Sequence, residues 1–194
     1  MKKLILIVAL LVFTSLFAAE SKLLEMNEAP PGGDFTLQSI AGPISTEMFR
    51  GKVVVLTFGY AGCPDICPMT LAHLSQSINA LGKGTVHEME AFFITLDPER
   101  DAIGDLNEFV KYFDEKIIAL TGSVPEINGV AEQYGVKHYQ VELKGSKTEY
   151  SINHSASTYV IAPDGELRFI FPYGTEPKLV SEAVEYLVHD RNQQ

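Results

Sequence analysis

The sequence of 194 residues contains no tryptophan, only two cysteines and few basic residues. Two cysteines cannot build a disulfide-dense scaffold, so a hydrophobic core must hold the fold, and an apolar content of 46% is sufficient for one. Lys and Arg number 15 against 25 Asp and Glu, which gives a formal net charge of −10. This charge argues against nucleic acid as a partner and against electrostatic docking on anionic lipid. The length is that of one ordinary domain.

The chain begins with an apolar run that has no charged side chain. Lys2 and Lys3 precede the run, which extends from Leu4 to Ala19, and this order is typical of a secretory signal. As a helix the run would be about 24 Å long, which is shorter than the roughly 30 Å hydrocarbon core of a bilayer. We therefore expect residues 1–19 to be a signal peptide, with a short membrane anchor as the alternative. The expected location is the bacterial periplasm or the outer face of the cytoplasmic membrane.

The rest of the chain is predicted to be a linker over residues 20–33, which ends in Pro-Pro-Gly-Gly, and one domain over residues 34–194. Within the domain, apolar runs alternate with segments of helical periodicity. The predicted strands are 35–40, 43–45, 53–60, 90–96, 116–120, 136–143, 148–152, 158–162 and 167–171, and the predicted helices are 68–81, 106–113, 125–134 and 176–189. This order predicts an α/β fold with a mixed sheet flanked by helices, an N-terminal β-hairpin and a late β-hairpin insertion.

Both cysteines follow the predicted strand 53–60, in the sequence GCPDICP at 62–68. If the segment forms a helical turn, this spacing places both sulfurs on one face. Pro68 suits the first position of a helix, so Cys67 is the expected N-cap, where the helix dipole would lower its pKa. Two thiolates favour Cu(I) or Zn(II), and an added imidazole gives a site that also tolerates Cu(II). The alternative is a disulfide between the two cysteines that has only a structural role in the loop.

The sequence FGYAGCPDICP at 58–68 resembles the copper-site motif of the Sco/SenC copper chaperones, which have a thioredoxin-like fold. Three further segments resemble that family in the same order: LDPERD at 96–101, YGV at 134–136, and NHSA at 153–156 ahead of YVIAPDG. The resemblance therefore implies a thioredoxin-like domain. Carried over by position, it makes Cys63 and Cys67 the thiolate ligands and His154 the imidazole ligand of one copper ion per chain, as Cu(I) or Cu(II).

The same resemblance implies a metallochaperone that helps to assemble the binuclear copper centre of cytochrome c oxidase. The implied partners are the copper-bearing subunit of the oxidase, an upstream copper donor and a thiol reductant, and a membrane tether is compatible with the N-terminal run. The alternative function is that of a thiol–disulfide oxidoreductase, in which Cys63 and Cys67 are the catalytic redox pair that reduces the oxidase's copper-ligand cysteines. A peroxiredoxin-type peroxidase is disfavoured, because Tyr60 and Pro64 stand where it needs Thr or Ser.

The other candidate residues have simpler interpretations. His73 is expected to face solvent from a helix. The remaining histidines lack the spacing to partner residues that a metal site needs and are expected to be surface residues, namely His87, His138 and His189. Met69 could offer a thioether to Cu(I), but packing or exposure at the rim of the site is the expectation. Asp65 is expected to cap the loop or to act in docking. The segment Asp97–Asp101 is expected to pack near the cysteines rather than to serve as an acid–base pair.

Overall fold

The computed structural model describes residues 29–143 and 150–191. The expected export segment, most of the expected linker and the expected turn at 144–147 lie outside the described residues. The end of the linker is attached to the domain, because the Gly32 amide donates to the Gln133 carbonyl at 3.1 Å and the Tyr134 hydroxyl donates to the Gly33 carbonyl at 2.8 Å. Within residues 29–143 and 150–191, no helix is long and apolar enough to cross a membrane.

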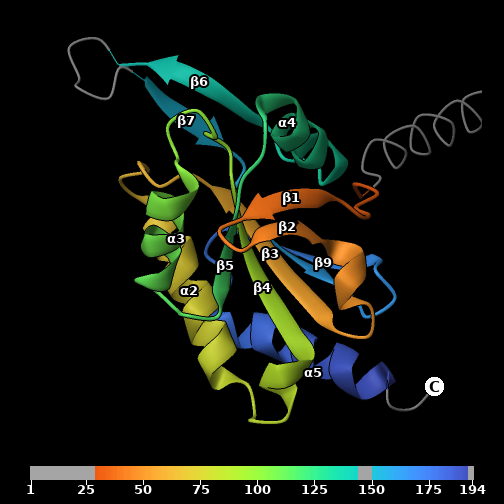
Figure 1. Ribbon diagram of the computed structural model, residues 1–194. Helices are drawn as coiled ribbons and strands as arrows, with labels where there is room; N and C mark the ends of the chain where they lie inside the picture. The colour runs from red at the N-terminus through yellow and green to blue at the C-terminus, as the bar shows by residue number, and fades with distance from the viewer. Residues whose placement is uncertain (1–28, 144–149, 192–194) are drawn as a thin grey trace, which may run out of the picture. The chain divides into compact units, whose positions relative to one another are not determined.

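A five-stranded mixed sheet forms the centre of the domain (Figure 1), with strand order β5-β4-β3-β8-β9. Strand β3 pairs in parallel with β4, and β4 pairs in parallel with β5. Strand β8 joins the other edge of β3 in the antiparallel sense and pairs with β9 in the same way. The five strands are β3 Val53–Gly59, β4 Met89–Thr95, β5 Ile117–Leu120, β8 Ser157–Ile161 and β9 Leu167–Pro172.

Each face of this sheet is covered by its own set of elements. Helices α2 (Ile66–Ala80), α3 (Ile103–Lys111) and α5 (Pro177–Arg191) pack against one face. The other face is covered by helix α4 (Val124–Gln133) and by the hairpin of β1 (Thr36–Ser39) and β2 (Gly42–Ser45). Both faces of β3 are therefore buried, as a continuous run of β-branched and aromatic residues predicts.

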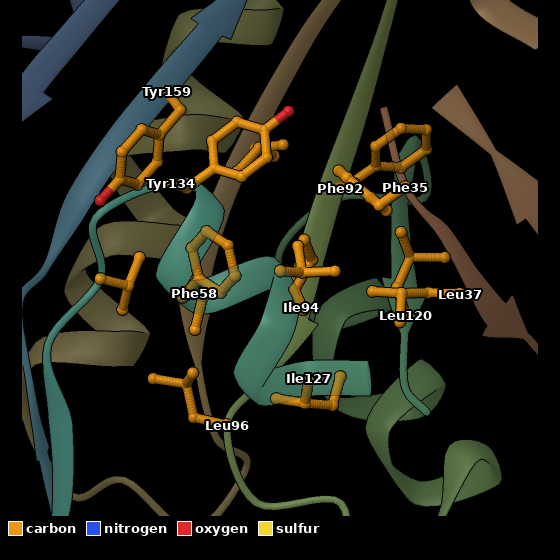
Figure 2. Packing of buried hydrophobic residues seen from close by; sticks show 14 of the residues in the cluster. Phe35, Leu37, Phe58, Phe92, Ile94, Leu96, Leu120, Ile127, Tyr134 and Tyr159 are labelled. Carbon is orange, nitrogen blue, oxygen red and sulfur yellow. The ribbon is translucent and has the colours of Figure 1, made fainter. Parts of the chain in front are cut away.

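The core on the α4 face is rich in aromatic rings. Figure 2 shows Phe58 and Ile94 of the sheet beside Ile127 of α4. The rings of Phe58 and Tyr159 meet edge to face with centroids 5.7 Å apart, and Tyr134 meets Tyr159 in the same way at 5.6 Å. Such pairs add stabilisation beyond the burial of their area. This aromatic packing supplies the large buried volume in a chain without tryptophan.

A second hairpin, of β6 (His138–Glu142) and β7 (Tyr150–His154), forms a two-stranded sheet of its own. In Figure 1 it extends away from the central sheet, near α4. The antiparallel register places His138 opposite His154. Strand β7 continues two residues beyond the predicted end at Ile152, so it carries His154 to the start of the short connection to β8.

Every predicted strand and helix with described residues is present, but several boundaries differ. Helix α3 begins at Ile103, three residues earlier than predicted, and α4 begins at Val124 because Ser123 and Glu126 form a capping box. Two short 3₁₀ helices were not predicted, η2 at Thr46–Phe49 and η3 at Thr85–Glu88. The mixed sheet, the flanking helices, the N-terminal hairpin of β1 and β2 and the late hairpin of β8 and β9 are confirmed.

Gly59 ends β3 at a point where its neighbours leave no space for a side chain. A Cβ atom there would lie 2.8 Å from Cys67 Sγ and 2.8 Å from the Phe93 ring. We expect Gly59→Ala to lower the free energy of unfolding by about 1–3 kcal/mol, because overpacking forces the neighbouring groups aside. Denaturant-induced unfolding measures this change.

Gly129→Ala is the matched control for that variant. A Cβ atom at Gly129, which lies within α4, would meet nothing within 4 Å. Alanine is favoured over glycine in a helix by about 1 kcal/mol, so this substitution should maintain or raise stability. Equal unfolding free energies for the two variants would contradict the close packing at Gly59.

Candidate metal centre

The loop between β3 and α2 carries both cysteines and is fastened to the acidic loop that follows β4. The Cys63 amide donates to the Tyr60 carbonyl at 3.2 Å, which closes a turn. The Ala61 amide donates to Asp101 Oδ2 at 3.0 Å, and the Thr95 hydroxyl donates to the same oxygen at 2.6 Å. Asp101 is therefore a buried acceptor that joins the two loops, and the expectation that the Asp97–Asp101 segment packs near the cysteines is confirmed.

Helix α2 begins at Ile66 with Asp65 as its N-cap, so the prediction that Cys67 is the N-cap is wrong. Proline lacks an amide hydrogen, but the amides of the whole first turn have no partner within the helix, so Pro68 fits there without loss. Cys63 lies in the preceding loop rather than on the same helical turn. The Cys67 amide instead donates to Cys63 Sγ, 3.5 Å away.

These hydrogen bonds make the two thiols unlike each other. The pKa of Cys63 lies far below its ordinary value because four groups hydrogen-bond to its sulfur. The largest effect comes from the Cys67 thiol, and the others come from the His154 ring and the amides of Asp65 and Cys67. The hydrogen bond with Cys63, together with burial, raises the pKa of Cys67. The prediction of a lowered pKa for Cys67 is therefore wrong, because the first-turn amide of the helix points at the other sulfur.

His154 reaches the cysteines from the end of β7. Its Nε2 lies 3.5 Å from Cys67 Sγ, and its Nδ1 lies 3.2 Å from the Ser155 carbonyl. A hydrogen bond donated from Nδ1 to that carbonyl leaves the Nε2 lone pair available to a metal ion. One ligand atom from each of Cys63, Cys67 and His154 lies within 4.8 Å of the other two. The structure thus brings all three predicted ligands together.

Both cysteines are free thiols in this structure, and they differ in their exposure to solvent. Cys63 is 8% exposed, whereas Cys67 is 2% exposed. A cavity of about 470 Å³ opens beside Cys63. Residues 63–66 line one side of it, and residues 151–155, at the end of β7, line the other. Two sulfurs and one imidazole nitrogen form a soft, three-donor set that suits copper. An incoming ligand would reach this set from the cavity.

The other residues considered from the sequence lie outside this donor set. Met69 is 47% exposed on α2, so its predicted exposure is confirmed, and His87 and His189 are exposed as predicted. His73 is partly buried. His138 is partly buried rather than a fully exposed surface residue, and its Nε2 lies 3.0 Å from Asn128 Oδ1.

Two tyrosines near the site were not predicted. The Tyr60 ring meets the His154 ring edge to face at a centroid distance of 6.2 Å, and the Tyr60 hydroxyl accepts a hydrogen bond from the Ile152 amide at 3.4 Å. The Tyr150 hydroxyl donates to Asp97 Oδ1 at 2.9 Å. The sequence placed Tyr60 at the end of a strand and in the cysteine motif but did not indicate its contact with His154. Nothing in the local sequence around Tyr150 indicates its partner, which lies 53 positions earlier in the chain.

The sequence of this chain is similar to those of known SCO proteins. The chain is 38% identical to the mitochondrial protein SCO1 homolog 1 of Arabidopsis thaliana over 148 residues, which are 76% of this chain and 43% of that protein. It is 34% identical to the SCO2-like protein of Rickettsia felis over 78% of this chain and 74% of that protein. The chain therefore spans less than half the length of the Arabidopsis relative.

Solved structures show the same fold. The structure of Arabidopsis thaliana ScoI with copper bound has a TM-score of 0.74 at 31% identity, with 82% of this chain and 98% of that chain covered. The structure of Bradyrhizobium japonicum ScoI with copper bound has a TM-score of 0.72 at 30% identity, with 81% and 99% covered. The predicted thioredoxin-like fold is confirmed. Because the SCO1/SenC family model matches residues 25–189, the chain belongs to the SCO1/SenC family.

Proposed function

We propose that this protein binds one copper ion through Cys63, Cys67 and His154 and takes part in assembling the copper centre of cytochrome c oxidase. The observation that carries the proposal is the convergence of one ligand atom from each residue within 4.8 Å. Membership of the SCO1/SenC family supports the choice of metal, since the two related ScoI proteins described above have copper bound. The proposed acceptor is the copper-bearing subunit of the oxidase.

The donor set explains how one site accepts both oxidation states of copper. Two thiolates are enough for Cu(I), which tolerates low coordination numbers, and the harder Cu(II) gains from the added imidazole. Copper is here the cargo, so the site must also release it. Cys63 lines the open cavity, whereas Cys67 is not among the residues that line it and is the less exposed of the two. An acceptor thiolate can therefore approach from the side of Cys63 and replace the protein's ligands one at a time.

The proposal includes export of the chain. Residues 1–19 would act as the signal, with a membrane tether as the alternative, and would place the domain in the periplasm or on the outer face of the cytoplasmic membrane. An upstream copper donor and a thiol reductant would act on it there, because thiols in an oxidising compartment must be reduced before they bind metal.

Anaerobic titration of the reduced protein should show one copper per chain in either oxidation state. With Cu(II), an intense thiolate charge-transfer band should appear and should be lost in Cys63→Ala. We expect His154→Ala to weaken Cu(II) binding by more than the roughly 10- to 100-fold that loss of an outer-shell partner costs, because a direct ligand is removed. Cu(I) affinity should change much less.

His189→Ala serves as the control for the titration, because His189 is exposed on α5 and is not part of the donor set. Its affinities for Cu(I) and Cu(II) should equal those of the unmodified protein. Full Cu(II) affinity in His154→Ala would exclude His154 as the third ligand.

A second function, thiol–disulfide exchange, is favoured by the inequality of the two thiols. The Cys63 thiolate would attack one sulfur of a client disulfide, form a mixed disulfide and release the other client sulfur as a thiol. Cys67 would then attack the Cys63 sulfur, so that a Cys63–Cys67 disulfide forms and the second client thiol leaves. The dithiol supplies the two electrons that the client gains. The lowered pKa and greater exposure of Cys63 support its assignment as the attacking group.

Substitution of each cysteine in turn tests this order of attack. Cys67→Ser should accumulate a mixed disulfide between Cys63 and a peptide that carries an oxidised cysteine pair, because the resolving thiol is missing. Cys63→Ser should accumulate much less, since Cys67 is buried and its pKa is raised. Mass spectrometry under non-reducing conditions measures both adducts. Equal trapping by the two variants would rule out the assignment of Cys63 as the nucleophile.

A further inference from the structure

The hairpin that carries His154 is not part of the central sheet. Strands β6 and β7 pair with each other and, among the described residues, form a sheet separate from β3 and its neighbours. An isolated two-stranded hairpin is only marginally stable in water. Both cysteines, in contrast, follow directly from β3, the middle strand of the central sheet. The distance from the imidazole to the sulfurs therefore depends on how the hairpin is fastened to the rest of the domain.

Side chains fasten β7 along its length. Near its middle, Ile152 is 5% exposed, and its amide donates to the Tyr60 hydroxyl of the cysteine loop at 3.4 Å. At its start, Arg100 Nη1 donates to the Tyr150 carbonyl at 2.9 Å. The Arg100 guanidinium also lies over the Tyr150 ring, 3.6 Å from its centroid. Backbone and ring of the same residue are thus held by one arginine.

Asp97 forms hydrogen bonds with both Tyr150 and Arg100. Its Oδ1 accepts the Tyr150 hydroxyl at 2.9 Å, and its Oδ2 accepts a hydrogen bond from Arg100 Nε. The Asp97 side chain is only 2% exposed. A buried carboxylate without partners is costly, so Asp97 keeps Arg100 and Tyr150 in place rather than leaving its oxygens unpaired.

We propose that Asp97 and Arg100 are positioning residues for the metal site, which hold β7 through Tyr150 where His154 can reach the two sulfurs. Neither residue belongs to the donor set, and Tyr150 lies four positions, or roughly 13 Å of extended strand, before His154. Arg100 also lies 5.8 Å from the centre of the Tyr60 ring, so it stands between the cysteine loop and the hairpin. This inference rests on the proposed function, because it assumes that His154 is a ligand.

Arg100→Gln tests the proposal by its effect on the two oxidation states. The variant should bind Cu(II) about 10- to 100-fold more weakly, the usual effect of losing an outer-shell partner, because the imidazole is no longer held over the sulfurs. Cu(I) affinity, which the two thiolates supply, should stay near that of the unmodified protein. Tyr150→Phe retains the ring beneath the guanidinium and loses only the hydrogen bond to Asp97, so its loss of Cu(II) affinity should be smaller.

A double-mutant cycle separates positioning from a general loss of stability. In the His154→Ala background, Arg100→Gln should cause no further loss of Cu(II) affinity, because there is no imidazole left to position. The control is Arg168→Gln, which removes an exposed arginine of β9 that pairs with Asp164 and Glu166. The control should bind copper as the unmodified protein does.

The outcomes of the cycle are distinct. Unchanged Cu(II) affinity in Arg100→Gln, or an equal loss with and without His154, overturns the positioning role alone. Unchanged affinity in His154→Ala overturns the ligand assignment of the proposed function and this inference with it.

Hydrogen exchange in the reduced, metal-free protein gives a readout that does not involve copper. Backbone amides of β7 should exchange faster in Arg100→Gln than in Arg168→Gln, because Arg100 contacts the backbone and ring of Tyr150 at the start of β7. The amides of β3 should be unchanged, because β3 is held between β4 and β8 in the central sheet. Equal exchange of the β7 amides in the two variants would overturn the proposal. Tyr150→Phe provides the same comparison if Arg100→Gln fails to fold.

Discussion

The His154 ring and the Cys67 sulfur lie 3.5 Å apart although 87 positions separate them in the chain, and the proposed metal site depends on this contact. The two cysteines alone form a dithiol that can hold a soft ion or close into a disulfide. The imidazole turns this dithiol into a three-donor set. Since His154 belongs to a hairpin outside the central sheet, the contact is a product of tertiary packing rather than of strand pairing.

One acidic loop after β4 serves both halves of the site. Asp101 accepts the Ala61 amide and so holds the cysteine loop, while Asp97 holds the hairpin through Arg100 and Tyr150. The two carboxylates therefore connect the cysteine loop and the hairpin to the same segment. Their burial is tolerated because each has hydrogen-bond donors directed at it. The parallel pairing of β3 with β4 brings this loop beside the cysteines, as expected at the carboxyl ends of parallel strands.

The proposed copper binding and the proposed thiol exchange both depend on the difference in pKa and exposure between Cys63 and Cys67. A first-turn amide of α2 and the neighbouring thiol favour a thiolate at Cys63, which lines the cavity. A thiolate at this position is what both a metal handover and an attack on a disulfide require. The buried Cys67 completes either reaction, as the second ligand or as the resolving thiol. The two proposed functions therefore differ in the partner that enters the cavity and not in the residues that act.

The sequence by itself determined the class of fold, the approximate place of each strand and α-helix and the identity of the two proposed sulfur donors. The periodicity of apolar residues and the turn residues are local properties of the sequence, so they can be read without the structure. The two cysteines likewise lie within the seven residues of the GCPDICP segment. The resemblance to a known family added His154. Sequence reasoning failed at the start of α2, because proline fits any position in a first turn and Pro68 could not fix the N-cap.

Only the tertiary structure decided which thiol is the thiolate and how the hairpin is held. The direction of the Cys67 amide depends on the path of the loop before the helix. The partners of Tyr150 lie about 50 positions away, at Asp97 and Arg100. The physical reason is that periodic patterns report only which face of an element is buried. The pairing of polar groups between distant loops is set by the packing of the whole domain.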